Sequence, residues 1–238
     1  MRIAMWSGPR NLSTAMMYAF GNRADFAVVD EPFYAAYLSQ TGLQHPMRDA
    51  ILAAQLKDGL EVEKALLGPV PEGKQHFYQK HMTQHMLPDV QRDWMRDVRH
   101  VFLLRHPARV VASFSAKYEG VTLDDIGFVQ QAELFDHVTA LGLSPLVIDS
   151  HDIRQDPEAM LRRLCDALEL SWDPDMLRWP SGGHRSDGVW AAHWYGSVHR
   201  STGFAGPEGP LPTLDAAGSA LAAAAMPYYE RLAAEKIS

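Results

Sequence analysis

Basic and hydroxyl side chains gather in one turn near the start of the chain. A short apolar run is followed by Ser-Gly-Pro-Arg-Asn-Leu-Ser-Thr over residues 7–14 and then by the helix-like segment AMMYAF. A turn from a strand into a helix aims the free N–H groups of the helix N-terminus at one point, which suits a phosphate. Gly8 allows close approach of the backbone, Arg10 offers a cation, and Ser13 and Thr14 offer hydroxyl donors. We therefore expect an anion site here; an ordinary connection with Ser13 as helix cap is the alternative.

A second turn repeats this design later in the chain. The apolar run HVFLL ends at Arg105, and Pro107 opens a helix-like segment that carries Ser113. Proline suits the first helical position, because the N–H that it lacks would have no partner there. An arginine just past a strand and a serine eight residues later can reach the same small anion. In the ordinary alternative, Arg105 caps the strand end and Ser113 bonds within its own helix.

Five short apolar segments, separated by segments of helical spacing, must position these turns. Strands are expected at residues 2–6, 26–30, 76–80, 100–105 and 145–150, and helical segments at 13–22, 63–67, around 84–96, 107–118, 124–142, 157–170 and 213–236. Strands that alternate with helices indicate an α/β protein with a mostly parallel sheet. Helices on both faces explain why the strands are continuously apolar. The predicted fold is a three-layer α/β sandwich with a central, mostly parallel sheet, forming one domain over residues 1–238.

The stretch from residue 171 to residue 212 departs from this alternation. It is rich in Trp, His, Gly and Pro and is predicted to be a long irregular segment. Loops of this length in a compact domain are usually functional lids or disordered, and the aromatic residues argue against disorder. We expect a lid over a bound ligand, with a satellite aromatic core as the alternative. Its histidines fit no compact zinc spacing, so no metal site is expected.

Composition and charge narrow the classes of function. The 238 residues carry a formal net charge of −7, which argues against binding to nucleic acid or to an acidic membrane surface. No apolar run approaches the roughly 20 residues of a membrane span, and the N-terminus lacks the pattern of a signal peptide. The lone cysteine, Cys165, favours a reducing compartment and a buried apolar role. We expect a cytoplasmic protein with a small-molecule partner; its oligomeric state stays open.

Together, the two turns resemble those of the sulfotransferases that use PAPS (3′-phosphoadenosine 5′-phosphosulfate). In that family a P-K-S-G-T-T-like turn holds the 5′-phosphosulfate, and an R-(x7)-S element holds the 3′-phosphate. Residues 9–14 match the P-K-S-G-T-T-like turn, except that Arg10 replaces its Lys and Leu12 replaces its Gly. Arg105 and Ser113 have the spacing of the R-(x7)-S element. The segment SHDIRQDPEAMLRRLCDALEL (150–170) resembles a family segment in which Y-E-D-L is followed by D-P and then by a helix. The segment VHRSTGF (198–204) resembles the family's late R-K-G loop. The motifs S-G-P-R-N-x-S-T and D-E-P-F are similar to those of a bacterial and plant subgroup.

The resemblance implies a P-loop, nucleoside-kinase-like fold and transfer of a sulfonate from PAPS to a small-molecule hydroxyl or amine. Adenosine 3′,5′-bisphosphate would be the product, and no metal would be needed. Ser150 stands where the cytosolic enzymes carry a tyrosine near the adenine, so an aromatic side chain from residues 172–195 is expected to stack there instead. The cofactor-binding residues implied by the resemblance are Gly8, Pro9, Arg10, Asn11, Ser13, Thr14, Arg105, Ser113, Arg200, Ser201 and Gly203.

Such a transfer needs a base for the acceptor proton and cations for the charge on the leaving phosphate. Glu31 and His81 are the two candidate bases, because both follow predicted strands, where open α/β sheets bind their ligands. Glu31 is preferred, since burial raises the pKa of a carboxylate toward neutrality; a helix cap before Pro32 is its alternative role. Lys80 and Arg10 are the candidate cations, and a solvated surface charge is the alternative for Lys80.

Two other functions remain open at this point. The strand end at Asp30-Glu31 resembles a magnesium-holding position, which keeps a kinase or another nucleotide phosphotransferase using ATP and magnesium as a rival. Leu12 and Ser150 also leave room for a catalytically inactive nucleotide-binding relative.

Overall fold

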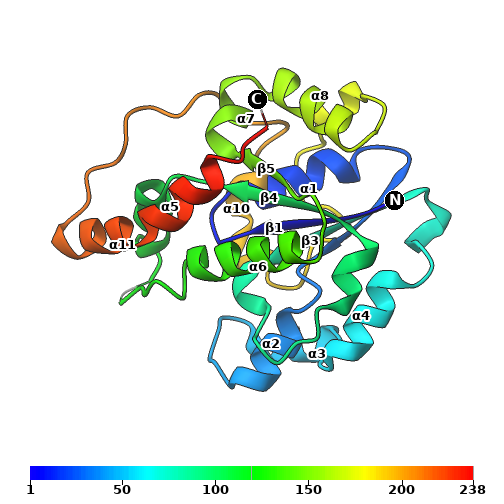
Figure 1. The fold of residues 1–238 in the computed structure, drawn as a ribbon, viewed down its shortest axis with the longest axis horizontal. Coiled ribbons are helices and arrows are strands. Elements are labelled where there is room, and N and C mark those ends of the chain that lie inside the picture. Colours follow the sequence, from blue (N-terminus) through cyan, green and yellow to red (C-terminus); the bar gives the residue numbers. More distant parts are fainter. Residues whose placement is uncertain (119, 238) are drawn as a thin grey trace.

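A single parallel sheet forms the centre of the computed structural model, which describes residues 1–118 and 120–237 (Figure 1). The strands are β1 (Arg2–Ser7), β2 (Phe26–Asp30), β3 (His76–Met82), β4 (Arg99–Leu104) and β5 (Leu146–Asp149), in the spatial order β2-β3-β1-β4-β5. All neighbouring strands pair in parallel. The five predicted strands are confirmed, each end within two residues.

Helices cover both faces of the sheet. The longer ones are α1 (Ser13–Gly21), α2 (Tyr34–Thr41), α3 (Arg48–Ala54), α4 (Gly59–Leu67), α5 (Pro107–Ser115), α6 (Phe128–Ala140), α8 (Pro157–Ala167) and α11 (Ala216–Ala233). Short turns of helix are η1 (Pro71–Gly73), η2 (Thr83–His85), η3 (Asp93–Asp97), α7 (Ser150–Gln155), η4 (Pro174–Leu177), α9 (Ala191–Trp194) and α10 (Gly196–His199). The three-layer arrangement predicted from the sequence is confirmed. The helix expected around residues 84–96 is wrong, because only two turns of 3₁₀-helix form there.

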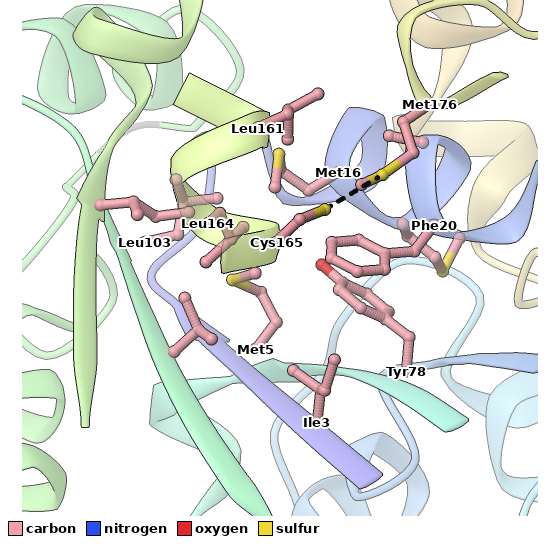
Figure 2. Packing of buried hydrophobic residues seen from close by; sticks show 14 of the residues in the cluster. Ile3, Met5, Met16, Phe20, Tyr78, Leu103, Leu161, Leu164, Cys165 and Met176 are labelled. Atoms are coloured by element: carbon pink, nitrogen blue, oxygen red, sulfur yellow. Dashed lines mark hydrogen bonds between the residues drawn. The ribbon is translucent and has the colours of Figure 1, made fainter. Parts of the chain in front are cut away.

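Alternate residues of β1 divide the core into two layers. Ile3 and Met5 pack against α1 and α8, as Figure 2 shows, whereas Ala4 and Trp6 pack against α4, α6 and η3. Successive side chains of a strand point to opposite faces, so a strand covered on both faces must be apolar throughout. Cys165 lies in the first layer, with its Sγ 3.7 Å from the Sδ of Met176, which confirms the buried apolar role predicted for it.

The region predicted as irregular contains little regular structure. Between residues 171 and 212 it forms only η4, α9, α10 and an isolated bridge between Arg178 and Gly203. From about residue 205 to the start of α11 it runs as an extended trace in Figure 1. Within the described residues, we find no helix that is both long and apolar enough to cross a membrane.

Candidate active site

A cavity of about 1120 Å³ lies at the carboxyl edge of the sheet. Each of the five strands ends beside a residue that lines this cavity: Arg10 three residues after β1, Glu31 after β2, Met82 at the end of β3, Arg105 after β4 and Ser150 after β5. The irregular region supplies the opposite wall, including Trp190, Trp194, Tyr195 and residues 200–205. This arrangement agrees with the general rule that open α/β sheets bind their ligands beyond the carboxyl ends of the strands.

The first turn leaves the N-terminus of α1 open toward the cavity. Leu12 is the N-cap residue of α1 and supplies no side-chain hydrogen bond, so Ser13 begins the helix and does not cap it. Ser13 and Thr14 line the cavity, together with Pro9, Arg10 and Asn11. The Asn11 amide donates to the Leu103 carbonyl at 3.2 Å and ties the turn to β4. Free N–H groups and a helix dipole therefore face the cavity.

Leu12 has a backbone conformation that normally favours glycine. Its φ of 72° lies in the left-handed region, and the φ of Arg10 in the same turn is 64°. Such a conformation costs an ordinary residue about 1–2 kcal/mol, so the surrounding contacts must hold it in place. Leu12 thus keeps the backbone geometry that a glycine would adopt without strain.

Gly8 packs against residue 126 and does not line the cavity. A Cβ atom at this position would lie 2.5 Å from the carbonyl oxygen of Ile126. Glycine is therefore required for the close packing of the turn on residues 126–127, since any side chain would collide with backbone there. Gly8, unlike Pro9 to Thr14, is therefore not among the residues that line the cavity.

The two turns meet directly. The Nε of Arg10 donates to the Ser113 hydroxyl at 2.9 Å, and Nη1 of Arg105 donates to the Arg10 carbonyl at 2.7 Å. Burial lowers the pKa of Arg10, and the charge of Arg105 lowers it further. Two neighbouring guanidinium groups therefore create a local excess of positive charge in an acidic chain, and this excess favours an anion. The alternative roles, in which Arg105 only caps its strand and Ser113 only bonds within its own helix, do not fit, because both side chains bond to Arg10 in the first turn.

The late loop reaches the same cavity. Arg200, Ser201 and Gly203 all line it. The Ser201 hydroxyl accepts a hydrogen bond from the Trp179 indole at 3.1 Å and donates to the Val198 carbonyl at 2.7 Å. A Cβ atom at Gly203 would lie 2.9 Å from the Leu177 carbonyl oxygen, so glycine permits the bridge between this loop and residue 178. Arg200 is the exposed cation of this loop.

Glu31 belongs to a buried polar cluster at the other end of the cavity. The Lys80 ammonium, only 1% exposed, donates to Asp30 Oδ1 at 2.8 Å, to the Tyr195 hydroxyl at 2.8 Å and to Glu31 Oε1. Burial raises the pKa of Glu31; Lys80 opposes the shift and Asp30 adds to it. Burial lowers the pKa of Lys80, but the two carboxylates outweigh it and the net shift is upward. Lys80 therefore stays charged, with all three of its donors engaged within the chain.

The backbone also singles out Glu31. Its φ of 42° is in the left-handed region, and its amide donates to the Lys80 carbonyl at 2.9 Å. The Gln55 side chain donates to the Glu31 carbonyl at 3.1 Å. The helix that follows starts at Tyr34, with Phe33 as N-cap, so Glu31 does not cap it. Strained backbone of this kind clusters at functional sites.

His81 lies on the opposite side of the sheet from Lys80. Its ring stacks on Trp6 with the centroids 4.4 Å apart, and it is not among the residues that line the cavity. Burial, followed by the charges of His100 and Lys80, lowers the pKa of His81 to about 3. The structure therefore does not bring His81 together with Glu31, because adjacent residues of a strand point to opposite faces.

Near Glu31 the cavity wall contains Tyr34, His45 and His85, which sequence reasoning missed, and Trp190, which lies in the predicted lid. The Tyr34 hydroxyl is 2.9 Å from Nδ1 of His45, and the Tyr34 ring stacks on His85 with centroids 4.5 Å apart. Trp190 packs edge-on against Tyr34 and donates to the Tyr195 hydroxyl at 3.0 Å. These residues come from distant segments and share no motif. Arg154 also lines the cavity and was missed, although it lies within the segment SHDIRQDPEAMLRRLCDALEL that resembles the family.

The geometry defines a class of α/β protein in which the first parallel strand leads into a helix without a side-chain cap, beside a cavity lined with arginines. Comparison with known families specifies it further. Residues 1–236 match the model of the sulfotransferase domain, and the chain belongs to that family. The family named from the two turns is thereby confirmed.

Two curated relatives match most of the chain. Branched-chain-amino-acid aminotransferase-like proteins 2 and 1 of Arabidopsis thaliana are 36% and 38% identical to the chain over 206 residues, which is 87% of it. The match covers 36% and 37% of their own lengths, so the chain spans about a third of these relatives.

Two solved sulfotransferase domains share the fold. The domain of the Synechococcus PCC 7002 olefin synthase has a TM-score of 0.59 at 18% identity, covering 98% of this chain and 94% of its own. The domain from the curacin biosynthetic pathway has a TM-score of 0.50 at 15% identity, covering 93% and 96%. At this level of identity, the likeness concerns the fold alone.

Proposed function

We propose that this protein transfers a sulfonate from PAPS to a small-molecule hydroxyl or amine and releases adenosine 3′,5′-bisphosphate. One observation carries the proposal: Arg10, Thr14, Arg105 and Ser113 line one cavity, and their two turns are joined by hydrogen bonds. A donor with phosphate groups at both ends needs two anion sites within one nucleotide's length. The direct contact of the two turns fits that requirement.

The unsatisfied polar atoms around the cavity fit a polar ligand. The Nε of Arg105 and the hydroxyl of Ser150 are buried and have no hydrogen-bond partner within the described residues. Unpaired buried donors are costly, so their presence beside a cavity favours a ligand that accepts from them. Five arginines line the same space: Arg10, Arg105, Arg154, Arg178 and Arg200. A doubly phosphorylated nucleotide matches this set of donors.

In the proposed reaction, Glu31 accepts the proton of the acceptor's hydroxyl or amine. The bond from the acceptor atom to sulfur forms, and the bond from sulfur to the bridging phosphate oxygen breaks. Arg10 and the N-terminus of α1 stabilise the charge that stays on the phosphate. Lys80 acts as a positioning residue, because its ammonium is committed to Asp30, Glu31 and Tyr195 and holds the Glu31 carboxylate at the cavity wall.

The aromatic wall favours an acceptor with an apolar part. Tyr34, Trp190 and Trp194 lie at the end of the cavity where Glu31 and Lys80 are found. His45 and His85 add polar atoms to the same wall, and burial lowers the pKa of both. Both are therefore neutral at pH 7 and add no charge to this end.

A magnesium-dependent kinase is less well supported. Asp30, the residue on which that alternative rested, is fully engaged: Oδ1 accepts from Lys80 at 2.8 Å, and Oδ2 accepts from the Gly188 amide at 3.1 Å and from Tyr195 at 2.8 Å. A cation at this carboxylate would lie against a buried ammonium group. The sulfonate transfer proposed here requires no such cation.

Thermal denaturation separates the two functions. Adenosine 3′,5′-bisphosphate at about 100 times its Kd should stabilise the protein by about 2.7 kcal/mol, because it binds only the folded state. For a chain of this size, that corresponds to a rise in Tm of about 5–10 °C. The rise should be the same with EDTA and with magnesium. A larger rise with ATP and magnesium than with the bisphosphate would contradict the proposal and favour the kinase.

Two substitutions of Leu12 test whether the first turn still binds the donor. Leu12→Gly should keep the affinity for the bisphosphate within about threefold, because glycine adopts the same left-handed conformation without strain. Leu12→Val should weaken the affinity about tenfold or more, because a β-branched residue is strongly disfavoured at φ 72°. Calorimetric titration of both variants, each below its own Tm, measures this. Equal affinities for Gly and Val would show that the conformation of residue 12 does not matter.

A further inference from the structure

A carboxylate of the chain itself occupies a pocket of three arginines. Glu208 Oε1 accepts from Nη2 of Arg105 at 2.5 Å and from Nη1 of Arg154 at 2.9 Å, and Oε2 lies 3.0 Å from Nε of Arg109. These arginines come from the end of β4, from α7 and from α5, and the Glu208 side chain is only 2% exposed. Three guanidinium groups around one carboxylate leave an excess of about two positive charges.

The segment that carries Glu208 has few other attachments. We define residues 205–210 (Ala-Gly-Pro-Glu-Gly-Pro) as the strap; it contains no helix or strand, and all its residues except Glu208 are exposed. Its carbonyl groups are bound by the same arginines: Arg154 Nε donates to Gly206 at 2.8 Å, and Arg109 donates to Gly209. The strap is therefore held mainly through the arginines that surround Glu208.

The arginine pocket belongs in part to the proposed nucleotide site. Arg105 and Arg154 line the large cavity, and Arg105 donates to the first turn through the Arg10 carbonyl. Among residues 1–118 and 120–237, the buried Nε of Arg105 finds no hydrogen-bond partner, so the carboxylate leaves one donor of the pocket unused. Burial raises the pKa of Glu208, but the hydrogen bond from Arg105 and the charges of Arg105, Arg109 and Arg154 outweigh it. Glu208 is therefore ionised near pH 7.

We propose that Glu208 is an internal competitor for a phosphate group, and that the strap must release its carboxylate from Arg105 and Arg154 before the 3′-phosphate of the donor or product can bind. The inference rests on the proposed function. A phosphate monoester carries about −1.5 to −2 charges at pH 7 and offers three acceptor oxygens, so it can displace a single carboxylate from three arginines. The apparent affinity for the nucleotide is then reduced by the fraction of molecules in which the strap is closed.

Calorimetry with Glu208→Gln tests this competition. Glutamine keeps the size of the side chain and removes its charge, so the strap should open more readily. We expect the variant to bind adenosine 3′,5′-bisphosphate about tenfold more tightly than the unaltered protein. Binding of AMP, which lacks the 3′-phosphate, should change by less than about twofold. Glu72→Gln is the matched control, because Glu72 pairs with Arg185 far from this pocket and outside the cavity wall.

The outcomes separate the inference from the proposed function. If the unaltered protein binds the bisphosphate and E208Q binds it equally or more weakly, the competitor role is wrong while the proposed function stands. If neither protein binds the bisphosphate, the competitor role and the proposed function are both wrong. An equal gain in affinity for AMP would also overturn the inference, since the strap would then block no specific phosphate.

A label on the strap's flank supplies a second measurement in case E208Q folds poorly. Leu211 is 50% exposed, and Cys165, the single cysteine of the chain, is buried. A spin label on Leu211→Cys therefore reports on the strap alone. The bisphosphate should increase the mobility of this label, and AMP should leave it unchanged. Unchanged mobility at saturating bisphosphate would mean that the carboxylate stays in place and is no competitor.

Discussion

Replacement of Glu31 by Gln is expected to lower the rate constant of sulfonate transfer by about 10²–10⁴-fold, the range typical of a general base. Glutamine has the same shape and can accept the hydrogen bond of Lys80, but it cannot take a proton from the acceptor. The affinity for adenosine 3′,5′-bisphosphate should stay within about threefold, because Glu31 follows β2, which β3 and β1 separate from the β4 strand that leads to Arg105. Single-turnover transfer of labelled sulfonate, together with calorimetry, measures the two effects separately.

The pH profile provides an independent check on Glu31. Burial raises its pKa above the ordinary value of 4.5, so the protonated, inactive form accumulates at higher pH than for an exposed glutamate. The transfer rate should fall as the pH decreases through this raised pKa, and the fall should be absent from the residual activity of the variant. Glu63→Gln on α4 is the control and should keep the full rate. A rate for Glu31→Gln within threefold of the original would remove Glu31 from the mechanism.

Replacement of Lys80 by Met is expected to reduce the free energy of unfolding by about 3–5 kcal/mol at pH 7, the usual cost of removing one partner from a buried ion pair. The substitution leaves the carboxylates of Asp30 and Glu31 buried together without the ammonium that joins them. Their repulsion and their lost hydrogen bonds both act against the folded state. Urea denaturation measures the loss, and Lys74→Met, whose ammonium bonds only the Ala24 carbonyl near the surface, is the matched control.

The pH dependence of the stability loss distinguishes the loss of the Lys80 ion pair from a simple loss of packing. Without Lys80, the charge that opposes the raised pKa of Glu31 is lost, so the folded-state pKa of Glu31 rises further above its unfolded value and the variant gains stability as a proton binds. The difference between the variant and the original protein should therefore shrink as the pH falls from 7 toward 4.5. A loss of stability that stays constant over this range would point to packing. A loss below about 1 kcal/mol would show that the cluster is far better solvated than its burial indicates.

The predicted site residues differ in how far local sequence determines their position. Residues 9–14 and the pair Arg105–Ser113 each lie within one strand–turn–helix unit, whereas the hydrogen bonds that join the two units, from Arg10 to Ser113 and from Arg105 to Arg10, connect residues 103 and 95 positions apart. The shared orientation of the two units follows from the local geometry of a parallel strand that enters a helix. Lys80 and His81 adjoin in the chain but lie on opposite faces of β3. Which of them reaches the cavity depends on the side that β3 presents within the sheet, and a shift of one residue would exchange them.

Local pattern alone determined the five strands, the layered α/β fold and the two strand–turn–helix units of Arg10 and Arg105, because apolar runs, turn residues and helix starts act over a few neighbouring residues. The tertiary structure decided the rest. It packed Gly8 against Ile126, enclosed Lys80 between two carboxylates, and placed Glu208 among arginines 54 to 103 residues away in the chain. Each of these contacts joins segments distant in sequence, and their energies arise from burial and charge pairing that exist only after the sheet and its connections have assembled.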